Sequence, residues 1–441
     1  MPFELRPFGN LFAEPTRNGL TRPKAVRGAG VKMVNMGELF AFPRLRNAPM
    51  DRVPLSESET EKSHLQEGDL LFARQSLVLE GAGKCTIFLE DDEPVTFESH
   101  ITRVRLNKSE ADPLYYFYYF QSPKGRAAIR SIVEQGAGAA GIRGSDLKSL
   151  QVEWRDVEEQ SEIAEILSSL DDKIELNCRM NETLEAIARA IFRSWFVDFD
   201  PVRAKASGEP PESICRRLGL TPDLLALFPD GFQDSELGEI PEGWKVRPVG
   251  EVVQVVGGST PSTKIPEYWE GGTYNWATPK DLSGLTAPVL LETERKITEL
   301  GLKQISSGLL PAGTLLLSSR APIGYLAISD VPVAVNQGFI AILCEDPLSP
   351  HYMLNWCHFN MVSIKQRAGG TTFAEISKSA FRPIQFIVPS TPILISFSNI
   401  AKPLYKLIAE HCRENASLGD MRDMLLPRLI SGELPVPPVK A

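Results

Sequence analysis

The stretch CRMNETL, at residues 178–184, returns as CRENASL at residues 412–418, an offset of 234 residues. The same offset joins other matched positions in the same order, namely Gly136 with Gly370, Ser145 with Ser379, Leu150 with Ile384 and Gln151 with Gln385. A period this long exceeds that of a solenoid repeat, so the sequence predicts a duplicated domain.

Two earlier blocks also match, RPFGNL with RPVGEV and GDLLFAR (68–74) with GTLLLSSR (313–320). On this alignment Arg74 and Arg320 occupy matching places. Either both arginines contact phosphates, or both form a structural ion pair. The stretches between the blocks differ. This pattern favours two recognition domains that share one scaffold and differ in what they recognise.

Each copy is expected to be a mixed α/β domain, since short apolar runs alternate with turn residues and one helix-like segment. The expected strands are VRLNKS (104–109), GDLLFA (68–73), TIFLED (86–91), TLLLSS (314–319) and VAVNQGFIAIL (333–343), with closing strands LQVEW (150–154) and IQFIV (384–388). The aromatic helix from residue 113 continues through a Ser-Pro break, and residues 351–368 are its counterpart.

The predicted organisation has two α/β domains separated by two long antiparallel helices that resemble a coiled coil. Its parts are a first domain (1–157), a central helix (158–200), a linker with one short helix at 221–228 (201–245), a second domain (246–391), a C-terminal helix (392–434) and a tail (435–441).

Heptad spacing predicts that the two long helices pack on each other. The seam positions, spaced by seven within each helix, are Ile163, Leu170, Asn177, Leu184 and Ile191, then Phe397, Leu404, His411, Leu418 and Leu425; a second line runs through Leu167, Ile174, Asn181, Ala188 and Trp195. Asn177 and His411 are equivalent, and a polar group there either fixes the register of the pair or faces solvent.

Two prolines bear on the C-terminal helix, because proline lacks the donor that a helix interior needs. Pro403 predicts that the helix starts late or kinks near Asn399, and Pro427 is expected to help end it. At the end of the central helix, Trp195 and Phe196 form an apolar group that the partner helix or another protein must cover.

The composition bounds the class of protein. The net charge of −9 arises in the middle of the chain, where residues 151–245 carry 10 basic and 21 acidic side chains, whereas residues 1–150 carry 20 and 19. The two repeated domains are therefore near neutral and can carry local basic faces. The scattered cysteines and the lack of long apolar runs predict a cytoplasmic protein with no membrane span and no leader.

The sequence contains no complete motif for catalysis, nucleotide binding or metal binding. The glycine pattern at 136–141 follows a helix rather than a strand, and the stretch at 81–85 lacks the first glycine and the final hydroxyl of a phosphate loop. The five histidines show no metal-ligand spacing, and no nucleophile elbow or paired carboxylates stand out. We expect no catalytic site, no metal and no cofactor on this chain.

Several longer stretches resemble the specificity subunits of type I restriction-modification systems. They are AIARAIFRSWFVDFDPVRAKA (186–206), LFPDGFQDSELGEIPEGWK (227–245), STPSTKIPEYWEGGTYNWATPKDL (259–282) and RDMLLPRLISGEL (422–434). The resemblance covers essentially the whole chain, with the first domain the most divergent part.

The resemblance implies a non-catalytic subunit in which each domain reads one half of an asymmetric, bipartite site in double-stranded DNA. It implies that the helices set the gap between the half-sites and dock two methyltransferase subunits, which bind S-adenosylmethionine, and that separate motor and nuclease subunits join them. A change of seven residues in the helix is then expected to change the gap and leave the half-sites as they were.

DNA contacts require cationic, amide or hydroxyl side chains on the domain surfaces. The candidates are Arg44, Arg46, Arg74, Lys124, Arg126 and Arg143 in the first domain, and Thr260, Ser262, Lys264, Lys280, Arg320, Lys365, Arg367, Thr371 and Lys378 in the second. The alternative for each is a solvated surface side chain. For the chain as a whole, the main alternative is a free-standing regulator that binds a bipartite DNA site without partners.

Overall fold

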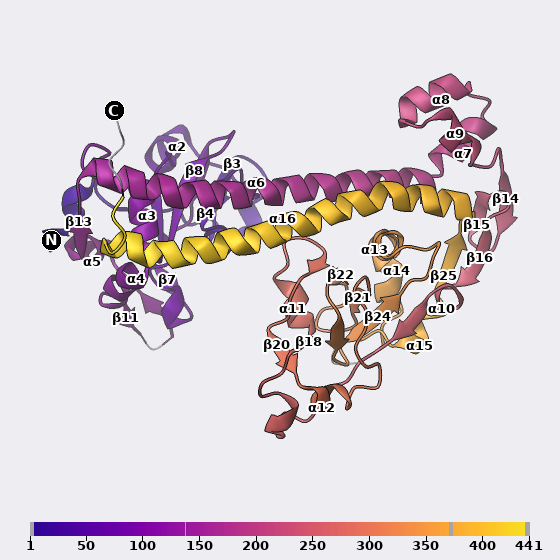
Figure 1. Ribbon diagram of the computed structural model, residues 1–441. Helices are drawn as coiled ribbons and strands as arrows, with labels where there is room; N and C mark the ends of the chain where they lie inside the picture. The colour runs from indigo at the N-terminus through magenta and orange to yellow at the C-terminus, as the bar shows by residue number, and fades with distance from the viewer. Residues whose placement is uncertain (1–3, 137, 370–373, 437–441) are drawn as a thin grey trace. The chain divides into compact units, whose positions relative to one another are not determined.

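The computed structural model describes residues 4–136, 138–369 and 374–436, and it divides into two compact units. Unit 1 comprises residues 1–173 and 418–441, and unit 2 comprises residues 174–417. The long helices α6 (Val157–Phe196) and α16 (Thr391–Ser431) each contribute residues to both units, and Figure 1 shows them side by side.

The main sheet of unit 1 has the strand order β2-β10-β6-β8-β4. Its strands are β2 (Arg17–Asn18), β10 (Ile101–Val104), β6 (Leu70–Ala73), β8 (Cys85–Glu90) and β4 (Arg44–Arg46). Three smaller sheets are formed by β5 (Asp51–Val53), β3 (Val31–Val34) and β9 (Val95–Phe97); by β1 (Glu4–Pro7) and β13 (Gln151–Trp154); and by β11 (Glu134–Gln135), β12 (Ala140–Gly141) and β7 (Gln75–Ser76).

The helices of unit 1 confirm the predicted Ser-Pro break. Helix α3 (Pro113–Gln121) ends before Ser122, whose side chain accepts from the Gly125 amide and caps α4 (Pro123–Arg130). The other short helices are α1 (Met36–Ala41), α2 (Glu57–Ser63) and α5 (Gly144–Ser149). The strand expected at residues 104–109 is wrong beyond Val104, because the Asn107 side chain accepts from the Ser109 amide and turns the chain.

Unit 2 repeats the topology of the main sheet of unit 1. Its main sheet, β17-β24-β21-β22-β19, has the same pattern of antiparallel neighbours and one parallel edge as the main sheet of unit 1. The strands are β17 (Gln254–Val256), β24 (Phe339–Leu343), β21 (Leu315–Ser318), β22 (Leu326–Ser329) and β19 (Val289–Leu290), with β20 (Arg295–Ile297), β18 (Tyr274–Ala277) and β23 (Val333–Val335) beside them, and β16 (Lys245–Pro248) paired with β25 (Gln385–Val388). The predicted duplication is therefore present in the backbone.

The helices of unit 2 follow the same order. Helix α13 (Pro350–Phe359) is the counterpart of α3 and buries an aromatic face against the sheet, and the remaining helices are α10 (Val249–Val252), α11 (Pro279–Ser283), α12 (Glu299–Leu302), α14 (Met361–Gln366) and α15 (Lys378–Phe381).

The segment expected to be a linker with one short helix is folded instead. It contains α7 (Asp200–Ala206), α8 (Pro211–Leu218), α9 (Pro222–Ala226) and the hairpin of β14 (Phe232–Ser235) and β15 (Gly238–Pro241). Its apolar residues join the large core of unit 2, which outweighs the turn-forming prolines and glycines. The Thr221 side chain accepts from the Leu224 amide and caps α9, which lies within the short helix predicted at residues 221–228.

The helix pair of unit 2 contains a polar layer at the repeated motif. The Asn177 side-chain amide lies 2.8 Å from the Asn415 side-chain oxygen, and Nδ1 of His411 lies 2.8 Å from the Asn181 side-chain oxygen. Because 177 with 411 and 181 with 415 are equivalent positions, these two contacts are related by a two-fold axis. Asn177 is fully buried, so the solvent-facing alternative is wrong.

The cysteines of the repeated motif take part in the same layer. The Asn181 amide lies 3.7 Å from the Cys412 sulfur, and the Asn415 amide lies 3.6 Å from the Cys178 sulfur. Residues three apart share one helix face, which explains why each copy has Cys-x-x-Asn. Burial raises the pKa of the Cys412 thiol to about 11, so a neutral sulfur accepts the hydrogen bond.

In the remaining helix seam, the degree of burial varies by position. Ile163, Phe397, His411 and Trp195 are buried, whereas Leu170, Leu184, Ile191, Leu404, Leu418 and Leu425 are partly buried. Trp195 is covered by Phe397 of α16 and by Phe228 of the folded connector, the segment of residues 201–245. The apolar end of α6 is therefore enclosed within unit 2.

Two of the proline predictions for α16 are wrong, namely the late start at Pro403 and the end near Pro427, whereas the alternative of a kink near Asn399 stays a prediction. The helix begins at Thr391, before Pro403, and continues past Pro427 to Ser431. Asn399 and Pro403 are exposed, so water can bond to the carbonyl that loses its donor. Beyond Pro427, Leu429 and Ile430 are buried in the core of unit 1, and that packing outweighs the local cost.

Candidate nucleic-acid interface

In the first domain, three chain segments meet where β6 ends. The Arg74 amide donates to the His100 carbonyl at 2.7 Å, and the Ile142 amide donates to the Arg74 carbonyl at 3.0 Å. Strand β7 pairs with β12, which places Gln75 opposite Gly141. The end of β6, the β9–β10 corner and the glycine-rich β11–β12 hairpin therefore form one surface.

The second domain builds the corresponding surface from the same three places. The Ser319 amide donates to the Gly338 carbonyl at 2.8 Å, and the Ile376 amide donates to the Ser319 carbonyl at 3.0 Å. Arg320 forms an isolated β-bridge with Glu375, as does Gly369. Polar side chains displayed at loop ends on a rigid sheet are the usual arrangement for a binding surface.

Sheet register corrects the alignment of the two arginines. Ala73 pairs with Ile101, and its counterpart Ser318 pairs with Phe339. The counterpart of Arg74 is thus Ser319, and that of Arg320 is Gln75. A slip of one residue reverses the face of a side chain in a strand. Accordingly, Arg74 donates to the Ser99 carbonyl at 3.3 Å, whereas the Arg320 guanidinium lies 3.7 Å from the Glu375 carboxylate.

Two arginines predicted to contact DNA have structural partners in unit 1. Arg44 is only 8% exposed and pairs with Asp172 of α6. Arg46 pairs with Glu90 at 2.5 Å and lies 3.5 Å from Asp172. Both arginines attach the edge strand β4 to α6, so we conclude that their role is structural.

The other candidates of the first domain are exposed at or near α4 and the hairpin. Lys124 pairs with Glu153, Arg143 pairs with Glu134 at 2.5 Å, and Arg126 lies on the exposed face of α4. The Arg143–Glu134 pair is exposed on both sides, and such pairs contribute little to stability and can exchange partners for phosphates, whereas Lys124 pairs with the buried Glu153.

In the second domain the candidates fall into two groups. Lys365 packs over Gly324, near Arg320, and Arg367 follows on the same exposed segment. Thr260 donates to the Gln337 side chain at 2.6 Å, and the Lys378 amine lies beside Gly257. Ser262 and Lys264 are exposed next to Thr260, and Lys280 pairs with Glu294 at 2.7 Å; Thr371 lies outside the described residues.

Gln337 is a candidate that sequence reasoning missed. It is exposed between β23 and β24, where one strand was expected over residues 333–343, and it contacts Thr260. Glutamine can pair with two atoms of adenine in the major groove, which makes it a suitable base reader. The sequence signal that could have identified Gln337 is its polar amide side chain between two apolar runs of the second domain.

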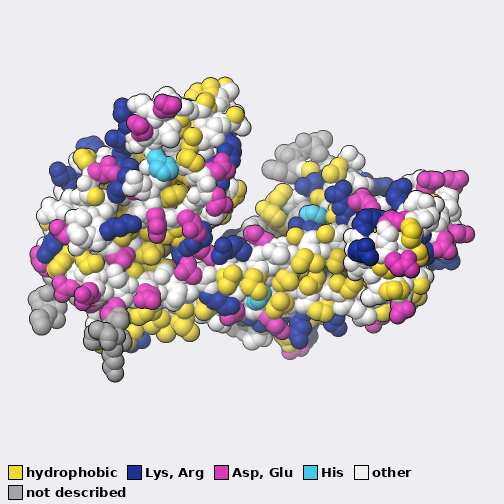
Figure 2. Space-filling model, turned by 90° about the horizontal axis from the view of Figure 1, so that it is seen from above, with side chains coloured by type: hydrophobic (Ala, Val, Ile, Leu, Met, Phe, Trp, Pro, Cys, Tyr) yellow, Lys and Arg dark blue, Asp and Glu magenta, His cyan; other side chains and the backbone are white. Residues whose placement is uncertain are grey.

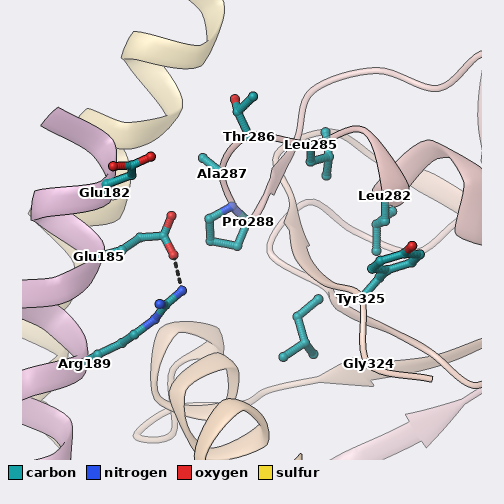
Figure 3. A pocket seen from close by; sticks show the side chains of 11 residues that line it. Glu182, Glu185, Arg189, Leu282, Leu285, Thr286, Ala287, Pro288, Gly324 and Tyr325 are labelled. Atoms are coloured by element: carbon teal, nitrogen blue, oxygen red, sulfur yellow. Dashed lines mark hydrogen bonds and ion pairs between the residues drawn. The ribbon is translucent and has the colours of Figure 1, made fainter. Parts of the chain in front are cut away.

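A pocket of about 390 Å³ lies in unit 2 between α6 and the second domain (Figure 3). Glu182, Glu185 and Arg189 of α6 form one wall, and Glu185 accepts from Arg189 at 2.5 Å. Burial raises the pKa of Glu185. This wall carries two carboxylates and one guanidinium, so its charge does not suit a phosphate backbone.

Two features are absent from the described part of the chain. No group of His, Cys, Asp or Glu side chains there could hold a metal ion. None of the helices in that part has the length and apolar character needed to cross a membrane.

The chain contains a duplicated α/β domain, and each copy carries a polar loop surface. Together with the long helix that joins the copies, this arrangement is that of a recognition protein with two binding domains. The family model described as the type I restriction modification DNA specificity domain matches residues 43–186 and 241–413. The chain therefore belongs to this family of specificity subunits, whose role is to recognise DNA sequence rather than to catalyse a reaction.

Individual relatives agree with this assignment. The chain is 28% identical over 417 residues to the type I restriction enzyme HindI specificity subunit of Haemophilus influenzae, with 85% of this chain and 88% of that protein covered. It is 41% identical over 161 residues to the MjaIX specificity subunit of Methanocaldococcus jannaschii, with 36% and 37% covered. The crystal structure of a type I restriction-modification S subunit from M. genitalium shares the fold, with a TM-score of 0.56, 16% identity and 97% and 96% of the chains covered.

The variant Arg320→Ala is expected to weaken binding to all DNA sequences and to lower the slope of log affinity against log salt by about one. The reason is that Arg320 is half-exposed and its distance of 3.7 Å from Glu375 leaves it available to a phosphate. Fluorescence anisotropy across a salt series measures the slope, with Lys303→Ala, an exposed lysine directly after α12, as the control. An unchanged slope would assign Arg320 to the structural ion pair.

Proposed function

We propose that this chain recognises an asymmetric, bipartite site in double-stranded DNA, with one half-site read by each domain. The observation that carries the proposal is the shared main-sheet topology of two domains whose exposed connections differ. Two copies of one scaffold with different loops suit two different half-sites, and an undivided site would need only one reader.

The long helices suit a role in setting the gap between half-sites. Helix α6 has 40 residues and α16 has 41, so each spans roughly 60 Å at the α-helical rise. Equivalent faces of the major groove recur about every 34–36 Å. The reciprocal Asn177–Asn415 and Asn181–His411 contacts fix the register of the pair.

We also propose that the helices dock two methyltransferase subunits, which would bring S-adenosylmethionine, and that motor and nuclease subunits join this complex. Leu176, Met180 and Ile187 form an exposed apolar stripe on the unit 2 part of α6, and Figure 2 shows apolar side chains gathered on the surface. Met421 and Met424 are exposed on the unit 1 part of α16. Ile187 and Met421 are equivalent positions, which favours two similar docking sites.

Co-expression with the adenine methyltransferase subunit tests this function. Single-molecule sequencing is expected to show N6-methyladenine in one bipartite motif with a fixed gap. A methyltransferase variant that cannot bind S-adenosylmethionine is the control and should leave no modified sites.

The second candidate function is a free-standing regulator. The polar loop surfaces described above would serve it equally well, but the exposed apolar stripe on α6 would then have no partner. A specific footprint by this chain alone, with no methylation and no co-purifying subunit, would favour the regulator.

A further inference from the structure

One difference between the two interface surfaces lies in the connection between two neighbouring strands of the main sheet. In the first domain residues 74–84 join β6 to β8, whereas in the second domain the shorter stretch 319–325 joins β21 to β22. The first connection contains β7 and a short 3-10 helix at Leu79–Gly81. The extra residues form a tip that the second domain does not have.

The tip carries three consecutive exposed apolar side chains. Leu77 is 90% exposed, Val78 is 60% exposed and Leu79 is 44% exposed. In the second domain the large aliphatic residue of the same connection, Ile323, is only 7% exposed and belongs to the core, and the exposed apolar residues there are the smaller Ala321 and Pro322. A run of exposed apolar residues is unfavourable in water and usually marks a surface that a partner covers.

Hydrogen bonds hold the tip in a defined conformation. The Val78 amide donates to the Ser76 hydroxyl at 3.2 Å, and the Gly81 amide donates to the Val78 carbonyl at 3.1 Å. Pairing of β7 with β12 places Ser76 opposite Ala140. The backbone therefore presents Leu77 and Val78 to solvent, beside Gln75.

Two cationic side chains, Lys84 and Arg126, lie near the base of the tip, and the tip itself contains the exposed, acidic Glu80. The Lys84 amine donates to the Phe40 carbonyl at 2.9 Å and lies 5.0 Å from the centre of the Phe40 ring. Desolvation, and then the nearby charge of Arg126, lower the pKa of Lys84. Gly83 packs against Ile129 of α4, the helix that carries Arg126. An apolar tip with cationic side chains at its base complements DNA, whose phosphates surround apolar base surfaces.

We propose that Leu77 and Val78 form an apolar, specificity-determining contact with the bases of the half-site read by the first domain. This inference rests on the proposed recognition of a bipartite site and names the chemistry of one contact within it. The apolar surfaces that DNA offers are the 5-methyl group of thymine in the major groove and base faces exposed at an unstacked step.

The test uses the full chain in complex with the methyltransferase subunit, and the wild-type motif is mapped first. The variants Leu77→Ser and Val78→Ser are expected to relax the half-site of the first domain and to weaken binding roughly tenfold, with the other half-site unchanged. The control is Leu237→Ser, in the exposed turn between β14 and β15, which should preserve the motif and the affinity.

Modified duplexes then separate the two sources of apolar contact. If thymine methyl groups are touched, replacing one thymine by uracil should weaken wild-type binding about fourfold, the effect of one lost methyl contact, and should not weaken Leu77→Ser further. If a step is unstacked, 2-aminopurine fluorescence should rise on binding of the wild type only.

Two results would overturn the inference. One is an unchanged first half-site and affinity in both serine variants. The other is loss of the methyltransferase subunit from the purified variants, which would make the tip a protein-docking surface. Absence of any motif with the wild-type complex would instead contradict the proposed function itself.

Discussion

Inserting seven residues into both long helices, after Lys173 and after Ser417, is expected to lengthen the gap between half-sites by up to about three base pairs. Seven residues add roughly 10 Å of helix, and the axial rise of DNA is about 3.4 Å per base pair. A heptad insertion turns the helix by only about 20° relative to its seam, so the buried face is kept. Both half-sites should stay unchanged, because neither recognition domain is altered.

The paired design follows from the antiparallel contacts. On one side of the insertion points, Asp171 and Arg422 pair at 2.7 Å; on the other, Asn177 and Asn415 lie 2.8 Å apart. Equal insertions keep both contacts. A single insertion in α6 cannot, so this variant should lose stability and serves as the control. Methylation sequencing of the complex gives the gap directly, and an unchanged gap in a stable paired variant would contradict the ruler.

The sequence predicted much of the scaffold, because the duplication and the heptads are regular patterns. The offset of 234 residues identified Asn177 with His411, and the structure places both in one polar layer. What the pattern could not show was that each bonds to the asparagine of the opposite copy's Cys-x-x-Asn motif. That pairing depends on where the two helices cross, and a period within one helix does not specify it.

The candidate site was predicted less well for a physical reason. Matching GDLLFAR to GTLLLSSR by its final arginine shifted the register by one residue. The correction comes from the sheets, where Ala73 pairs with Ile101 and its counterpart Ser318 pairs with Phe339. Arg44 resembled an exposed cation in sequence but is buried against Asp172, which lies more than 100 positions further along the chain. Such long-range ion pairs leave no local signal.

The variant Trp195→Ala is expected to lower the free energy of unfolding of unit 2 by about 3–5 kcal/mol. Trp195 is 3% exposed, and its ring centre lies 5.3 Å from that of Phe228 and 6.2 Å from that of Phe397. Truncation therefore removes a contact shared by α6, α16 and the folded connector, and leaves a cavity that three elements must close together.

Urea unfolding followed by circular dichroism measures this cost, with the two units treated as separate transitions because a chain of this size need not unfold in one step. The neighbouring Val197→Ala is the matched control: Val197 is 41% exposed, so its truncation should cost less than about 0.5 kcal/mol. A cost below about 1 kcal/mol for Trp195→Ala would mean that this end of α6 is not enclosed within the chain. The methyltransferase subunit would then be the partner that covers Trp195.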